Sequence, residues 1–281
     1  YTKINDGYKQ KKQGPLGLVT SYGESYGDSR AAQLHFMEDL FNYMRTNKDD
    51  NYADMTQFML GTTNEYKFTK RDIKAINRVL NREMPLAVRV SKATDILNVL
   101  KFADSQQIDL ILWGASEAHM VADEIARAGI PVILDPAPYK ENVSQMYKNI
   151  NIITPNEIEA SNISKTEVKD MLSAKKAARY IRNLGCDNVI ITLGSKGVWV
   201  ETENISEHVS SYEVKAKSSV AAGDAFNGAL GYGIVKNNNL EESIYLAIAT
   251  SSMCVTRDGA QNSMPKIDEV LKFINLNEKK L

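Results

Sequence analysis

Hydrophobic residues in the middle of the chain recur at two alternating spacings. Short apolar runs, which are typical of buried parallel strands, are separated by segments in which apolar residues recur every three or four positions, as on one face of a helix. The predicted strands are residues 86–90, 110–113, 132–134, 151–154 and 189–192, and the predicted helices are residues 94–103, 117–128, 143–150 and 165–184. Strands that alternate with helices in this way predict parallel βαβ units.

The pattern before the first of these strands is different. Residues 1–30 are polar and rich in Lys, Gly, Ser and Tyr, which favours loop structure. Apolar side chains fall on one helical stripe in residues 31–44 and on another in residues 70–80, so we expect two amphipathic helices there. The expected fold class is α/β, with a mostly parallel sheet, helices on both faces and a ligand site at the carboxyl ends of the strands.

Composition and charge narrow the range of binding partners that the chain is expected to have. The chain has 281 residues, of which 43% are hydrophobic and 25% charged, as expected for a globular protein with one large domain or two smaller ones. Its formal charge of −1 provides no field that would hold nucleic acid or an anionic membrane, so small-molecule partners are favoured. No apolar run reaches the roughly 18 residues of a membrane span, and there is no signal-peptide pattern. Because the chain begins at Tyr1 rather than Met, we expect a fragment or a processed protein.

The two cysteines bear on the compartment. Cys186 and Cys254 lie far apart in the sequence, each in an apolar context, so we expect neither a disulfide framework nor a zinc site. A reducing, cytoplasmic location fits this pattern.

The stretch with the most chemical content is residues 220–228, Val-Ala-Ala-Gly-Asp-Ala-Phe-Asn-Gly. Its small residues let backbone N–H groups approach a ligand closely, and the apolar spacing that follows predicts a helix whose first turn holds Asp224. A helix N-terminus offers unpaired N–H groups and the positive end of a dipole, which favour phosphate, while a carboxylate can take a proton from an attacking hydroxyl. This combination predicts phosphoryl transfer to an alcohol, with an ordinary acidic N-cap region as the structural alternative.

Four motifs in order resemble the C-terminal half of the ribokinase-like (PfkB) carbohydrate kinases. Besides the AAGD stretch, they are residues 154–159 (TPNEIE), 191–197 (ITLGSKG) and 255–261 (VTRDGAQ), and the resemblance covers residues 131–281. It implies a ribokinase-like fold in that half. It further implies that Asp224 is the catalytic base and that the loop amides, including those of Ala222 and Gly223, form an anion hole.

The same resemblance implies ATP and Mg²⁺ as cofactors. Asn156 and Glu159 are expected to organise Mg²⁺ and the phosphates, commonly through water, and their oxygen donors suit a hard cation; an N-capped turn with a solvent-facing carboxylate is the alternative. A glycine turn into a hairpin at 198–200 would also explain the GSKG sequence. The residues expected to bind the nucleotide are Asn156, Glu159, Thr192, Gly194, Ser195, Gly197, Ile248, Gly259 and Ser263.

Two positions depart from the family pattern. Ser218 and Ser219, followed by Val220, stand where the family usually has Asp-Thr-Thr, and that aspartate contributes to a monovalent-cation site, so K⁺ activation stays open. Ile248 occupies the position aligned with an adenine contact. Its side chain can pack on a base but cannot form a hydrogen bond with it.

Residues 14–135 resemble a different family, part of an amidohydrolase barrel related to imidazolonepropionase, through residues 85–96, 114–119 and 121–133. The metal-binding histidines of that family would correspond to Ser91 and Gly114, so both ligands are missing. We expect amidohydrolase-barrel-like βα units in residues 1–135, joined as a fusion or chimera to a ribokinase-like segment in residues 136–281. The usual N-terminal half of a sugar kinase is not recognisable.

The favoured function is ATP-dependent phosphorylation of a hydroxyl group on a sugar or related small alcohol. A non-catalytic nucleotide-binding or structural fusion is the alternative, and a degenerate amidohydrolase comes third. The expected partners are the acceptor and ATP, with neither nucleic acid nor membrane. The sequence leaves open which acceptor is used and whether the chain forms a homodimer.

Overall fold

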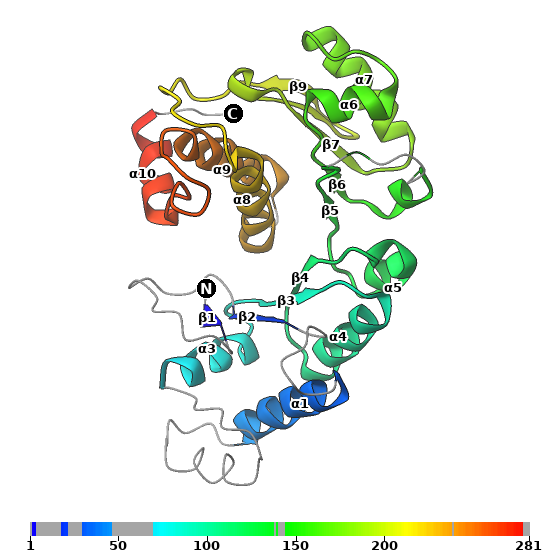
Figure 1. Cartoon of the computed structure of the whole chain (residues 1–281), viewed down its shortest axis with the longest axis vertical. Helices are drawn as coiled ribbons and strands as arrows, with labels where there is room; N and C mark the ends of the chain where they lie inside the picture. Colours follow the sequence, from blue (N-terminus) through cyan, green and yellow to red (C-terminus); the bar gives the residue numbers. More distant parts are fainter. Residues whose placement is uncertain are drawn as a thin grey trace. The chain divides into compact units, whose positions relative to one another are not determined.

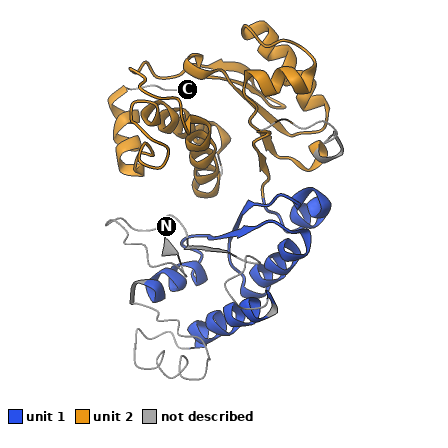
Figure 2. Cartoon of the chain, viewed as in Figure 1, with its two compact units in different colours: residues 1–130 blue, residues 131–281 orange. Residues whose placement is uncertain are grey.

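The structure is a computed structural model of the chain. It describes residues 2–3, 18–21, 30–46, 70–137, 139, 144–237 and 239–277. The chain divides into two compact units, Tyr1–Ile130 and Pro131–Leu281 (Figure 2). Among the described helices, none combines the length and the apolar character needed to cross a bilayer.

The first unit contains a parallel sheet whose strand order is β1-β2-β3-β4 (Figure 1). These strands are β1 (Thr2–Lys3), β2 (Leu18–Ser21), β3 (Leu86–Val90) and β4 (Leu110–Gly114). The helices of this unit are α1 (Arg30–Thr46), α3 (Lys70–Leu80), α4 (Ala93–Gln106), the 3₁₀-helix η1 (Ala118–Val121) and α5 (Ala122–Arg127). Helix α3 and strand β3 begin and end where the sequence pattern predicts, while the helix expected over 117–128 is divided into η1 and α5.

Two expectations for the first unit are corrected. The stretch 1–30 was expected to be loop, yet it contains β1 and β2. Strand β2 pairs in parallel with the buried strand β3, and β1 pairs in parallel with β2. These strands form through pairing with their neighbours, because the stretch has no apolar periodicity of its own. A barrel closes only when its two end strands pair with each other. In the described part of this unit, β1 and β4 are the two edges of an open sheet, so the barrel-like closure is absent there.

Strands of the second unit form a mixed sheet in the order β5-β6-β7-β8-β9, parallel from β5 to β7 and antiparallel from β7 to β9. They are β5 (Ile133–Leu134), β6 (Ile152–Ile153), β7 (Asn188–Thr192), β8 (Val198–Glu201) and β9 (Ser206–Val209). The helices are η2 (Ser144–Asn149), α6 (Glu157–Ser164), α7 (Met171–Asn183), η3 (Gly194–Lys196), α8 (Ala222–Asn237), α9 (Leu240–Cys254) and α10 (Ile267–Asn277).

Two helices of this unit differ from the prediction. The segment expected as a helix over 143–150 is the 3₁₀-helix η2. Helix α7 begins at Met171 rather than at Lys165, because Asp170 caps it: the Asp170 carboxylate accepts a hydrogen bond of 2.7 Å from the backbone N–H of Ser173. Lys165 instead ends α6 in the left-handed conformation.

Alternate residues of the β6 and β7 strands face opposite sides of the sheet, as the period of a strand requires. Ile153 and Ile191 pack into one apolar cluster with helix α7, while Ile152 and Ile190 pack into another with α8 and α9. Figure 1 shows α6 and α7 on one side of this sheet and α8, α9 and α10 on the other. The expectation of helices on both faces is therefore confirmed for the second unit.

The turn between β7 and β8 depends on two glycines. Gly197 has φ of 100°, and a Cβ atom there would lie 2.1 Å from the carbonyl oxygen of Val209 and 2.6 Å from the backbone nitrogen of Ser211. Gly194 has φ of 58°, but a Cβ atom there would meet no other atom within 4 Å. The two positions thus share a left-handed backbone and differ in the space around them.

Replacing a core side chain of α7 tests the packing of the second unit. Ile181 is fully buried, so we expect Ile181→Ala to lower the free energy of unfolding by about 2–5 kcal/mol. Leu172 on the same helix is 63% exposed, and Leu172→Ala should change it by less than about 0.5 kcal/mol. Urea unfolding followed by tryptophan fluorescence gives both values. Equal effects would contradict the assigned buried face of α7.

Alanine at the two glycines separates backbone strain from steric conflict. Gly194→Ala should destabilise the protein by the roughly 1–2 kcal/mol of a left-handed alanine. Gly197→Ala should cost distinctly more, because the conflicting atoms belong to the backbone and cannot move aside independently. The same urea unfolding measurement compares them. A Gly197→Ala variant as stable as Gly194→Ala would show that the turn does not approach Val209 as closely as described.

Candidate functional site

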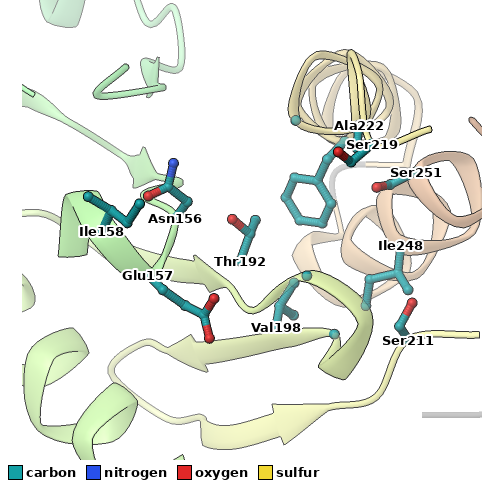
Figure 3. Close-up of a pocket in the computed structure, with 14 residues that line it drawn as sticks. Asn156, Glu157, Ile158, Thr192, Val198, Ser211, Ser219, Ala222, Ile248 and Ser251 are labelled. Carbon is teal, nitrogen blue, oxygen red and sulfur yellow. The ribbon is translucent and has the colours of Figure 1, made fainter. Parts of the chain in front are cut away.

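A cavity of about 430 Å³ opens in the second unit at the carboxyl ends of β6 and β7 (Figure 3). The parallel pairing continues past the named strands, since Asn156 and Thr192 form an isolated parallel bridge. The N–H group of Thr192 donates to the carbonyl oxygen of Pro155 over 2.9 Å. The cavity is lined by Asn156, Glu157, Ile158, Thr192, Gly194, Gly197, Val198, Ser211, Ser219, Ala222, Gly223, Phe226, Ile248 and Ser251.

The cavity unites most, but not all, of the residues expected in the site. Those that line it are Asn156, Thr192, Gly194, Gly197, Ala222, Gly223 and Ile248. Those that do not are Glu159, Ser195, Asp224, Gly259 and Ser263. Ser195, Asp224 and Gly259 are exposed, whereas Glu159 and Ser263 are buried. The lining residues come from segments that are distant in sequence, from α6 to α9.

The lining is apolar on one side and polar on the other. Val198, Phe226 and Ile248 are buried side chains whose surfaces face the cavity. In Figure 3, Val198, Ile248 and Ser211 lie near one another, and Ala222 and Ser219 mark the beginning of α8. The hydroxyl groups of Ser211 and Ser251 lie beside this apolar surface. The rest of the lining comes from the start of α6 with Thr192, from the glycine turn and from the start of α8.

The loop that enters α8 exposes backbone N–H groups. Ala221 has a left-handed φ of 61°, which is unusual for a residue with a side chain. The N–H of Ala222 donates to the carbonyl oxygen of Ser219 over 3.2 Å, and no backbone bond of this kind is made by Gly223 or Asp224 within the described residues. Gly223 is exposed, and a Cβ atom there would meet nothing within 4 Å. The first turn of α8 therefore presents free donors beside the Asp224 carboxylate.

The loop is supported from behind by Cys254 and Ser263. The Cys254 sulfur is buried and lies 3.8 Å from the carbonyl oxygen of Ala221 and 3.2 Å from the hydroxyl of Ser263. The Ser263 hydroxyl donates to the carbonyl oxygen of Ala260 over 2.7 Å and is fully buried. In this structure, Ser263 thus contacts Cys254, which packs against the loop, and does not line the cavity.

The Asn156 and Glu159 side chains form a capping box at the start of α6. The Asn156 side chain accepts from the backbone N–H of Glu159, and the Glu159 carboxylate accepts from the backbone N–H of Asn156, both over 2.9 Å. Glu159 is only 8% exposed, so it is not the solvent-facing carboxylate of the alternative reading. The neighbouring carboxylate of Glu157 lies 3.6 Å from the Lys196 ammonium group of the glycine turn.

Few acidic side chains gather near the cavity. Within the part of the chain that the structure describes, no three residues among His, Cys, Asp and Glu are grouped as a metal ion would require. Magnesium commonly keeps several water ligands and takes one or two carboxylates together with phosphate oxygens. The donor set at the start of α6 suits a metal ion bound in that way, not one enclosed by protein ligands.

Sequence reasoning missed two further polar residues beside the start of α8. Asn227 Nδ2 donates a hydrogen bond of 2.8 Å to the Asp135 carboxylate at the end of β5. Desolvation raises the pKa of Asp135, and the negative charge of Asp224 raises it further, while the Asn227 and Ala137 hydrogen bonds act in the opposite direction. The available signal was the three-residue spacing of Asp224 and Asn227, which places both on one helix face.

A second missed contact involves the glycine turn. His208 on β9 donates from Nε2 to the carbonyl oxygen of Lys196 over 2.6 Å. No partner for His208 was predicted, because strand β9 and its pairing with β8 were not predicted either. This hydrogen bond holds the glycine turn against strand β9.

Comparison with known proteins supports a relationship to sugar kinases. The pattern of the pfkB family carbohydrate kinases matches residues 104–267, which contain all the site residues described above. The match begins in the first unit. It therefore includes residues 104–135, which the sequence analysis assigned to the amidohydrolase-like segment.

Individual relatives are ribokinases. The chain is 36% identical over 168 residues to the ribokinase of Haemophilus influenzae, covering 60% of this chain and 54% of that protein. It is 40% identical over 155 residues to the ribokinase of Staphylococcus aureus, covering 54% and 51%. The chain thus spans about half the length of these curated relatives.

A solved structure gives the same relationship. The structure of Arabidopsis thaliana ribokinase complexed with ribose and ATP superposes with a TM-score of 0.55 at 26% identity, covering 66% of this chain and 60% of that one. Because the family pattern spans more than half of the chain, this protein belongs to the pfkB family of carbohydrate kinases.

Proposed function

We propose that this protein is an ATP-dependent phosphotransferase that phosphorylates a hydroxyl group of a sugar or related small alcohol. The observation that carries the proposal is the first turn of α8, where the Asp224 carboxylate and free backbone donors stand beside a cavity with an apolar far side. Relatives named ribokinase support the choice of a sugar as acceptor.

The cavity suits a nucleoside triphosphate. Its volume of about 430 Å³ lies in the range of about 300–1,000 Å³ that is usual for small-molecule sites. We place the base against Val198, Phe226 and Ile248, where packing rather than side-chain hydrogen bonding from Ile248 holds it. The phosphates then extend toward Gly194 and Gly223, where no Cβ atom fills the space and the α8 dipole favours negative charge.

The proposed chemistry is an in-line displacement at phosphorus. The acceptor hydroxyl oxygen forms a bond to the terminal phosphorus, the bond to the bridging oxygen breaks, and ADP leaves with the electron pair. Asp224 accepts the hydroxyl proton. The N–H groups at the start of α8 donate to the charge on the transferred group; those of Gly223 and Asp224 have no backbone partner among the described residues.

Magnesium, when bound, neutralises phosphate charge and aligns the transferring group. Asn156 and Glu159, with Glu157 beside them, would hold it through water, since the first two are engaged in the capping box. We include no K⁺ in the proposal, because Ser218 and Ser219 carry hydroxyl groups and no carboxylate. Two buried free cysteines, Cys186 and Cys254, fit a reducing cytoplasm.

The two alternative functions are a non-catalytic nucleotide-binding protein and a degenerate amidohydrolase. A non-catalytic nucleotide-binding protein has the same cavity, so only turnover separates it from a kinase. The strand ends of the first unit do bring Ser91 and Gly114 together, since a Cβ atom at Gly114 would lie 3.8 Å from Ser91 Oγ. This pair offers one hydroxyl and no imidazole, so we do not propose a hydrolase function.

Titration with Mg-ATP tests the nucleotide site. We expect saturable heat of binding by calorimetry, reduced when Mg²⁺ is removed with a chelator. Ser219 is exposed at the cavity beside α8, and Ser219→Glu should weaken binding roughly tenfold, since like charges about 4 Å apart repel by about 1–4 kcal/mol between water and a protein surface. Leu172→Glu, remote from the cavity, is the control. Absence of binding at millimolar nucleotide would contradict the proposed site.

Replacing the proposed base tests the chemistry. Asp224→Asn should lower kcat for ATP-dependent sugar phosphorylation by roughly 10²–10⁴-fold, because the amide cannot accept the proton, and should leave nucleotide affinity nearly unchanged. Asp268→Asn is the matched control, since Asp268 is also an exposed carboxylate in the first turn of a helix, α10. A coupled assay for ADP gives kcat for both variants, and calorimetric titration with Mg-ATP gives their nucleotide affinity. Equal losses of affinity and turnover would assign Asp224 a structural role.

A further inference from the structure

A polar pair joins α8 to the end of β5. Asn227 and Asp135 are 92 residues apart, and the amide nitrogen of Asn227 donates to the Asp135 carboxylate over 2.8 Å. It directly links the end of the β5 strand to the helix that carries Asp224. The pair lies outside the residues that line the cavity.

One face of α8 turns toward β5 at successive positions. Asp224, Asn227 and Gly231 are spaced by three and four residues, so they share a face of the helix. A Cβ atom at Gly231 would lie 3.6 Å from Ile133 Cδ1, which shows how closely this face approaches the strand. The Asn227–Asp135 bond joins this face to the end of β5, one turn nearer to Asp224. The bond and the close approach of helix and strand along one face together restrain rotation of the helix about its axis.

The orientation of the Asn227 amide also follows from its partner. A carboxylate only accepts hydrogen bonds, so Nδ2 must face Asp135. This leaves Asn227 Oδ1 buried with no hydrogen-bond partner among the described residues. The Asn227 side chain is therefore oriented by its bond to Asp135.

The electrostatics of Asp135 agree with this geometry. Desolvation raises the pKa of Asp135, the charge of Asp224 adds a smaller effect in the same direction, and the hydrogen bond from Asn227 lowers it.

We propose that Asp135 and Asn227 form a positioning pair that holds the first turn of α8 in register with β5 and so places the Asp224 carboxylate for proton transfer. This inference rests on the proposed phosphotransferase function. Neither residue touches the substrate. Both act through Asp224, and displacement of a reacting group by about 1 Å is enough to lower turnover by roughly 10²-fold.

The test compares Asn227→Ala with the exchanged pair Asp135→Asn/Asn227→Asp, which restores a carboxamide-to-carboxylate bond in the reverse direction. Asn227→Ala should lower kcat by roughly 10- to 100-fold while KM for ATP stays nearly constant. The exchanged pair should recover most of the lost turnover. Hydrogen–deuterium exchange, measured on the full chain by mass spectrometry, should be faster at residues 222–227 in Asn227→Ala and should return toward the original rate in the exchanged pair.

Asn188→Ala is the matched control. Asn188 Nδ2 donates to the carbonyl oxygen of Asn151 over 2.9 Å at the opposite end of β7 from Thr192, so the variant also removes one carboxamide hydrogen bond. It should leave both kcat and exchange at residues 222–227 unchanged. Equal loss of turnover in Asn188→Ala and Asn227→Ala would overturn the proposal, because general destabilisation would then explain both.

Two further outcomes distinguish failure of the positioning pair from failure of the proposed phosphotransferase function. If the unaltered protein shows no phosphoryl transfer, the proposed function fails and exchange alone decides: unchanged exchange in Asn227→Ala overturns the pair, and faster exchange reversed in the exchanged pair supports it. If Asn227→Ala instead increases the Mg²⁺ concentration needed for activity and the exchanged pair does not reverse this, Asp135 acts on the metal ion, and the positioning role is wrong.

Discussion

The candidate site depends on the parallel pairing of β5, β6 and β7. Backbone bonds from Ile152 to Val132 and from Thr192 to Pro155 align these strands so that their carboxyl ends meet at one edge of the sheet. That edge brings together Asp135, Asn156 and Thr192, which no local feature of the sequence would unite. Helix α8 then packs across the sheet through Phe226 and Leu230, so that its N-terminus lies at the same edge. Moving any of these strands by one residue would turn its side chains to the other face.

One of the two described non-glycine residues with positive φ in the second unit, Ala221, lies where the chemistry is proposed; the other, Lys165, ends α6. Ala221 adopts a left-handed conformation that costs about 1–3 kcal/mol for a residue with a side chain, and it immediately precedes α8. Such a conformation persists only when its surroundings enforce it. The buried Cys254 sulfur against the Ala221 carbonyl, itself supported by Ser263, provides that enforcement. A residue that the family resemblance assigned to ligand binding therefore contributes, in this structure, to the rigidity of the loop.

Apolar periodicity predicted the elements that are buried by their own pattern, such as α3, β3 and β7, to within about one residue. It failed where structure comes from partners distant in sequence. Strands β2 and β9 exist because they pair with neighbouring strands, and α7 begins late because Asp170 caps it. Of the predicted glycine turn and AAGD loop, Gly194, Gly197, Ala222 and Gly223 line the cavity, whereas Ser195 and Asp224 do not. The Asn227–Asp135 bond could not be predicted, because it requires knowing that β5 ends beneath α8.

The capping box at the start of α6 bears on the proposed magnesium site. Asn156 and Glu159 bind each other's backbone N–H groups, so the oxygen donors that would hold hydrated Mg²⁺ are already oriented by the helix they cap. Preorganised donors of this kind need little rearrangement when an ion binds, which preserves binding free energy for the phosphate contacts. The structural and the functional interpretations of this motif are therefore not alternatives. The cap sets the geometry that an ion site would require.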